Sequence, residues 1–84
     1  MLNYLEEKAY LEAHGNLHRA QMKANYRFQT DEARVEAAEI SEEERYNYLD
    51  IIIHNYDMDL KQAEAEYDHS MDRIRSWKKL RRER

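Results

Sequence analysis

The sequence predicts an all-α protein, an antiparallel two-helix hairpin that resembles a coiled coil. The 84 residues include no Pro and a single Gly, so the chain lacks the residues that tight turns and sheets require. The C-terminal half places an apolar residue or Ala at every third or fourth position, with only Ser70 breaking the pattern. This alternation is typical of a helix packed along one seam. The periodic set is Tyr46, Leu49, Ile53, Tyr56, Leu60, Ala63, Tyr67, Ser70, Ile74 and Trp77.

The first helix is expected over about residues 2–39. Apolar and small residues recur there with a period close to the 3.6 residues per turn of an α-helix. Gly15 followed by Asn16 resembles a helix end, and Thr30 followed by Asp31 resembles a helix start. A glycine inside a helix costs only about 1 kcal/mol, which favours a continuous helix over a broken one.

The second helix is expected over about residues 42–81. Ser41 precedes three glutamates, and its hydroxyl is suited to accept a hydrogen bond from the Glu44 amide. The glutamates complement the positive end of the helix dipole. A basic segment over residues 72–84 complements the opposite end.

A chain that reverses near residue 40 brings together positions whose numbers sum to about 81. This pairing places Phe28 beside Ile53, and it places Tyr67 near Ala13 and His14. It also places Leu60 opposite Ala20 and Ala24, so that large side chains meet small ones. It also places the basic segment beside the acidic residues Glu6, Glu7 and Glu12.

A single hairpin is predicted to leave apolar surface uncovered. Ile51, Ile52 and Ile53 are consecutive, which spreads apolar side chains over about 200° of the helix surface. A chain of 84 residues also buries a small fraction of its surface on folding, which disfavours a stable monomer. The simplest solution is a twofold dimer that forms a four-helix bundle. The predicted interface residues are Tyr48, Ile51, Ile52 and Met58.

Composition limits the class of protein. The formal net charge is −4. Because Cys is absent, disulfides and thiolate metal sites are excluded. Charged residues interrupt the N-terminal segment, and the longest aliphatic run is too short to cross a bilayer, so we expect a cytoplasmic protein without a membrane segment. No Gly-rich phosphate loop or activated nucleophile is apparent, which predicts a protein that is not an enzyme.

Two histidine patterns have the spacing of metal ligands. His14 and His18 are four residues apart on one helix face, but they lack a third ligand. Glu66 and His69 match the Glu-x-x-His element of di-iron bundles, but this element occurs only once. A solvated charged face is the favoured interpretation of both patterns, so no metal and no cofactor are assigned.

The basic C-terminal segment is the feature that most favours an alternative function, the binding of nucleic acid. Its bases recur at helix spacing, and its tryptophan is able to stack on a nucleobase. The competing interpretation is that these bases stabilise the helix end and pair with acidic residues near the N-terminus. The candidate nucleic-acid-binding residues are Arg75, Trp77, Lys78, Lys79 and Arg82.

The sequence as a whole favours a non-enzymatic helical interaction protein, such as an adaptor, a regulator or a small inhibitor. We expect it to bind a protein partner through a helical face and to form a homodimer. A small nucleic-acid-binding protein is the first alternative. A metal-binding helical bundle is the second.

Overall fold

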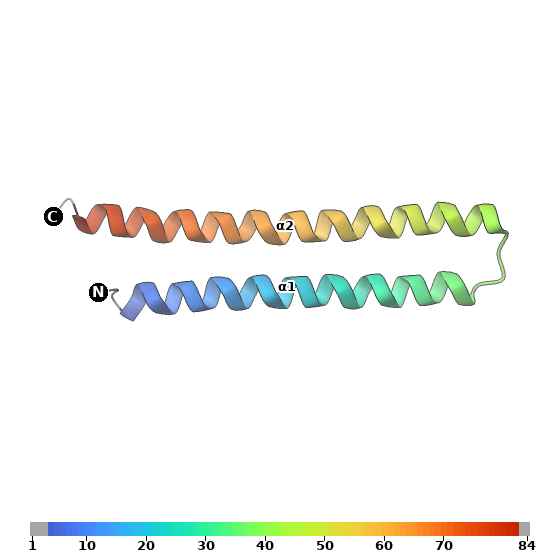
Figure 1. Ribbon diagram of the computed structural model, residues 1–84, viewed down its shortest axis with the longest axis horizontal. Coiled ribbons are helices and arrows are strands. Elements are labelled where there is room, and N and C mark those ends of the chain that lie inside the picture. The colour runs from blue at the N-terminus through green and yellow to red at the C-terminus, as the bar shows by residue number, and fades with distance from the viewer. Residues whose placement is uncertain (1–3, 83–84) are drawn as a thin grey trace.

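The computed structural model describes residues 4–82, and the side chains of residues 4–80. Two helices, α1 (Tyr4–Ala37) and α2 (Glu42–Arg82), lie side by side and run in opposite directions (Figure 1). The Cα atoms extend over 66 × 17 × 10 Å. The predicted all-α hairpin is therefore confirmed, although the predicted helix start at residues 2 and 3 lies outside the described residues.

Helix α1 is continuous through both positions that resemble helix boundaries in the sequence. No described residue, including Gly15, has a positive φ angle. The Thr30 hydroxyl donates a hydrogen bond to the Tyr26 carbonyl oxygen over 2.8 Å, so it satisfies a backbone acceptor instead of starting a new helix. The helix ends where the Ala38 amide donates to the Val35 carbonyl oxygen over 3.3 Å.

Helix α2 begins at the predicted cap. The Glu44 amide donates to Ser41 Oγ over 3.2 Å, and the Arg45 amide donates to the Ser41 carbonyl oxygen over 3.0 Å. The first bond satisfies an amide that has no backbone partner within the helix, and the second is the first i→i−4 bond of α2. The connection between the helices is therefore only residues 38–41.

The core between the helices is thin and is built from small residues. On α2, the buried residues Ile52, Ala63 and Ile74 are eleven residues apart, and on α1 the buried Ala13 and Ala24 have the same spacing. Eleven residues over three turns is 3.67 residues per turn, which is close to the period of a straight helix. Each of these side chains therefore points in nearly the same direction, toward the other helix.

The predicted seam is correct in its middle and wrong at three positions. Leu60, Ala63 and Tyr67 do lie toward α1, but Ile53 is 54% exposed, and Tyr46 and Trp77 are exposed as well. A strict alternation of three and four follows a period of 3.5, which drifts by about 20° per heptad around a straight helix. Ile52 occupies the inward position that was predicted for Ile53.

The register between the helices agrees with the predicted pairing. The Tyr56 hydroxyl donates a hydrogen bond to Asn25 Oδ1, and the His14 ring lies against the Tyr67 ring; the residue numbers of each pair sum to 81. Phe28, which is predicted to lie beside Ile53, has its ring centroid 5.0 Å from that of Tyr56. Within the described residues, neither helix contains a stretch apolar enough to cross a membrane.

Candidate interaction surfaces

The two sides of the hairpin differ in chemistry. At 100° per residue, four residues of α1 and five of α2 project toward the same side of the seam, each row within about 40°. We call this surface the aromatic side. It consists of Tyr10, Leu17, Phe28 and Val35 on α1 and of Leu49, Ile53, Leu60, Tyr67 and Met71 on α2.

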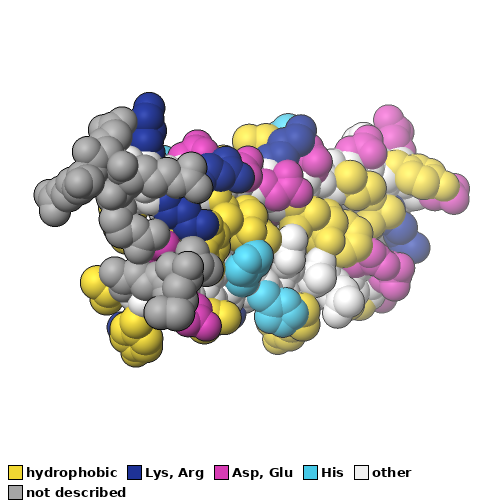
Figure 2. All heavy atoms as spheres, turned by 60° about the vertical axis from the view of Figure 1, so that its left-hand side comes forward, with side chains coloured by type: hydrophobic (Ala, Val, Ile, Leu, Met, Phe, Trp, Pro, Cys, Tyr) yellow, Lys and Arg dark blue, Asp and Glu magenta, His cyan; other side chains and the backbone are white. Residues whose placement is uncertain are grey.

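Ring contacts between the helices hold the aromatic side in place. The Phe28 and Tyr56 ring centroids are 5.0 Å apart, and those of His14 and Tyr67 are 5.2 Å apart. Figure 2 shows hydrophobic side chains gathered along the hairpin between the two helices. Because rings from both helices meet here, this surface is ordered by the hairpin itself.

The aromatic side is only partly covered. Ile53 is exposed, and the other eight side chains of the set are half-buried. No described side chain with a large volume is fully buried anywhere in the chain. The apolar residues of the aromatic side therefore flank a core that consists mainly of alanine and isoleucine. Other large apolar residues, among them Tyr26, Tyr48 and Ile51, are exposed outside the aromatic side.

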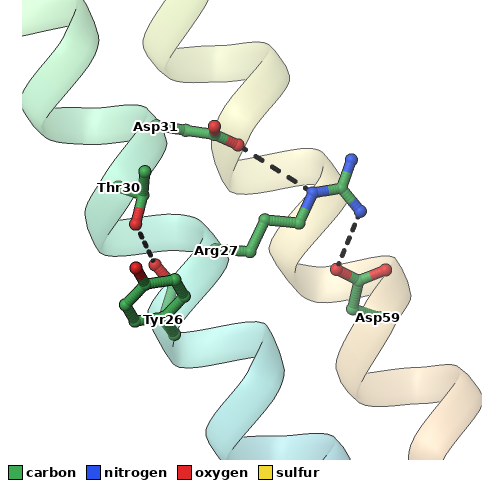
Figure 3. Close-up of polar contacts among 5 residues, drawn as sticks. All are labelled: Tyr26, Arg27, Thr30, Asp31 and Asp59. Atoms are coloured by element: carbon green, nitrogen blue, oxygen red, sulfur yellow. Dashed lines mark hydrogen bonds and ion pairs between the residues drawn. The ribbon is translucent and has the colours of Figure 1, made fainter.

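The opposite side of the hairpin, which we call the polar side, carries charged residues. Arg27 extends from α1 toward α2, with Nε 3.9 Å from Asp31 Oδ2 and Nη1 3.4 Å from Asp59 Oδ2 (Figure 3). An open groove of about 280 Å³ lies between the helices on this side. Its floor is alanine and its rim is charged: Ala20, Lys23, Ala24, Arg27, Asp59, Gln62, Ala63 and Glu66.

One predicted interface residue is contradicted by the structure. Ile52 is only 8% exposed, because its side chain points into the core of its own hairpin, so it is not available to a second copy. Tyr48, Ile51 and Met58 are exposed, as an interface requires. They lie outside the aromatic side, because their directions around α2 are those of the polar side and the outer face.

The basic C-terminal segment is partly engaged with its own chain. Arg75 Nη1 lies 3.2 Å from Asp72 Oδ1, and Lys78 Nζ lies 5.1 Å from the centre of the Tyr10 ring. Trp77 is 43% exposed and Lys79 is exposed. Arg82 lies at the end of α2, but its side chain is outside the described set.

The histidine patterns do not gather metal ligands. His14 contacts Tyr67, whereas His18, Glu66 and His69 are exposed. Within residues 4–80 no group of three or more His, Asp or Glu side chains is arranged to hold a metal ion.

One exposed ion pair perturbs a pKa. Lys61 Nζ lies 2.9 Å from Asp57 Oδ2. The hydrogen bond to Asp57, together with the charge of that carboxylate, raises the pKa of Lys61 above its ordinary value. This is a surface pair one turn apart on α2, and it does not prepare Lys61 for catalysis, because a general base requires a pKa shifted toward neutrality.

Comparisons with protein-family models, curated protein sequences and solved structures give no match to this chain. The function is therefore inferred from the surfaces of the hairpin.

Among those surfaces, the aromatic side is the one that the sequence-based interpretation missed. Its signal is present in the sequence as the spacing of Tyr10, Leu17, Phe28 and Val35, which are seven, eleven and seven residues apart.

Proposed function

We propose that this protein is a non-enzymatic helical interaction protein that acts by packing its aromatic side against a further protein chain in a homo-oligomer. The observation that supports this proposal is the continuous row of apolar side chains that both helices contribute to one side of the seam. Rings and aliphatic chains from both helices gather on one side, where Ile53 is 54% exposed. The described residues of the opposite side line a groove with a charged rim.

The accessible surface supports the same proposal. A compact monomer of 10.3 kDa is expected to expose about 5,400 Å², whereas this chain exposes 7149 Å². A protein interface of standard size covers about 800 Å² on each partner. The excess surface is thus large enough to supply one interface, and a second hairpin packed on the aromatic side would give a four-helix bundle.

The test compares two aspartate substitutions on α2. Ile53→Asp places a charge on the aromatic side, and Ile51→Asp places the same charge outside it, with similar exposure of the parent residues. Light scattering on the unsubstituted protein should give about twice the chain mass. Ile53→Asp should give a monomer of unchanged helicity by circular dichroism, because burying an unpaired carboxylate in the interface has a large free-energy cost.

Two results would contradict this proposal. The first is an unsubstituted chain that stays monomeric at tens of micromolar. The second is a dimer that Ile51→Asp dissociates and Ile53→Asp leaves intact. That second result would instead favour the interface predicted from the sequence at Tyr48, Ile51 and Met58.

A second candidate function is nucleic-acid binding by the basic segment of α2. Exposed bases at this end, including Arg73 and Lys79, flank the partly exposed Trp77 ring. Binding of labelled single-stranded RNA and duplex DNA, measured at 50 and 200 mM salt, separates the two functions. Phosphate binding predicts an affinity that falls steeply over this range and a loss of binding on deletion of residues 79–84.

A further inference from the structure

The apolar rows of the aromatic side are symmetric on each helix. On α1, Leu17 and Phe28 lie equally far from a midpoint between residues 22 and 23, and so do Tyr10 and Val35. A row with this spacing coincides with itself when it is reversed. It therefore suits a copy of the same helix that runs in the opposite direction.

The row on α2 has the same property about Leu60. Ile53 and Tyr67 are each seven residues from Leu60, and Leu49 and Met71 are each eleven residues from it. A reversed copy of α2 centred on Leu60 would therefore place an apolar residue opposite each apolar residue of the row.

The two midpoints lie at nearly the same level along the hairpin. The contacts of His14 with Tyr67 and of Asn25 with Tyr56 pair residues whose numbers sum to 81, so the midpoint of α1 lies within one helical turn of Leu60. One twofold axis, perpendicular to the long axis of the hairpin, is able to pass close to both midpoints. The symmetry of the two rows is thus compatible with one dimer.

Charge also distinguishes the two possible directions of a second copy. The connection and the start of α2 carry the exposed Glu39, Glu42, Glu43 and Glu44, whereas the other end carries the exposed bases Arg73, Arg75 and Lys79. Figure 1 shows that the last turns of α2 lie at the end that holds the termini, opposite the connection. When α2 lies across α2, a reversed copy brings the acidic start of one helix to the basic last turns of the other, and a parallel copy brings like charges together.

We propose that the occupant of the aromatic side is a second copy of this chain in the reversed direction, with α1 across α1 and α2 across α2. This proposal deepens the function proposed above and rests on it. In this arrangement Leu60 meets the partner's Leu60, and Ile53 meets the partner's Tyr67. Glu42 and Lys78, each eighteen residues from Leu60, form two symmetric ion pairs between the chains.

The direction of the partner is measured by distances between spin labels. Because the chain contains no Cys, a single Cys at position 43 or 61 gives one label per chain. In a reversed dimer, labels at position 43 lie about 50 Å apart, since this position is seventeen residues from the axis at 1.5 Å per residue. Labels at position 61, which lie close to the axis, should be within about 30 Å.

A copy in the same direction predicts a short distance at both positions, and that result would overturn the proposal. If light scattering shows a dimer, the function proposed above stands even when this arrangement fails. A monomer overturns both proposals. The two failures are therefore distinguishable within one set of samples.

Charge reversal gives an independent measurement of the proposed ion pair. Glu42→Lys and Lys78→Glu should each weaken the dimer about fivefold or more at low salt, because each places like charges opposite each other twice per dimer. The double variant should recover an affinity within about twofold of the unsubstituted protein.

Glu43→Lys is the matched control, because it makes the same change of charge one residue away on the outer face of α2. It should weaken the dimer less than Glu42→Lys. The proposal fails if the two variants behave alike or if the double variant does not recover its affinity. Circular dichroism on each variant checks that the helices remain formed.

Discussion

Arg27 on α1 lies 3.4 Å from Asp59 on α2, measured from Nη1 to Oδ2, and this ion pair joins the helices on the polar side (Figure 3). The same guanidinium also lies 3.9 Å from Asp31 on its own helix. One cation thus lies between a carboxylate of each helix, above the alanine floor of the groove.

Loss of the Arg27 and Asp59 pair should cost little stability. Both side chains are partly exposed, and ion pairs of this kind contribute about 0.2–1 kcal/mol. A double-mutant cycle with Arg27→Ala and Asp59→Ala, followed by urea unfolding at a fixed chain concentration, should give a coupling energy in this range. The coupling should shrink in 1 M salt, and a salt-independent value would contradict an electrostatic origin.

Ile52→Ala should be the most destabilising of the isoleucine truncations at positions 51–53. Ile52 is the buried member of the run, and removing a buried isoleucine to alanine typically costs about 2–5 kcal/mol. Ile51→Ala is the control, with an expected change within about 0.5 kcal/mol. Equal losses from both variants in thermal or urea unfolding would show that α2 is rotated relative to the structure described.

Ser41→Ala should lower the free energy of unfolding by about 1 kcal/mol. The substitution removes the acceptor of the Glu44 amide at the start of α2. Ser41→Asp is the control, since an aspartate at the same position can accept that hydrogen bond and should retain most of the stability. A loss of equal size in both variants would mean that the hydroxyl does not cap the helix.

Gly15→Ala should stabilise the protein by about 0.5–1 kcal/mol. Gly15 lies inside a continuous helix, and alanine has the higher helix propensity. The new methyl group would meet only the end of the flexible Arg19 side chain, with the nearest atom at 3.7 Å. A fall in the melting temperature at fixed protein concentration would show that this position requires glycine for a contact with a partner.

Particular residues show how far the sequence-based prediction reached. The absence of Pro and the Ser41 cap were sufficient to place both helices, and the pairing that sums to 81 located Tyr67 beside His14. The same reasoning placed Ile53 inside the seam and Ile52 outside it, and the structure reverses those two positions. Of the predicted interface residues, only Ile52 is affected, because the structure buries its side chain in the core of its own hairpin.

The sequence by itself determined the local features of this protein: two long helices, their boundary and their antiparallel pairing. These features follow from backbone propensity, capping and periodicity, which act between residues close together in the chain. Only the tertiary structure decided which isoleucine points inward and on which side of the seam rings from the two helices meet. Ile52 and Ile53 point in directions about 100° apart around α2. Helix propensity and capping are the same whichever of the two side chains faces α1, so they do not determine the rotation of α2 about its axis. That rotation is fixed by how closely Ala13, Ala24 and Ala63 allow the two helices to approach.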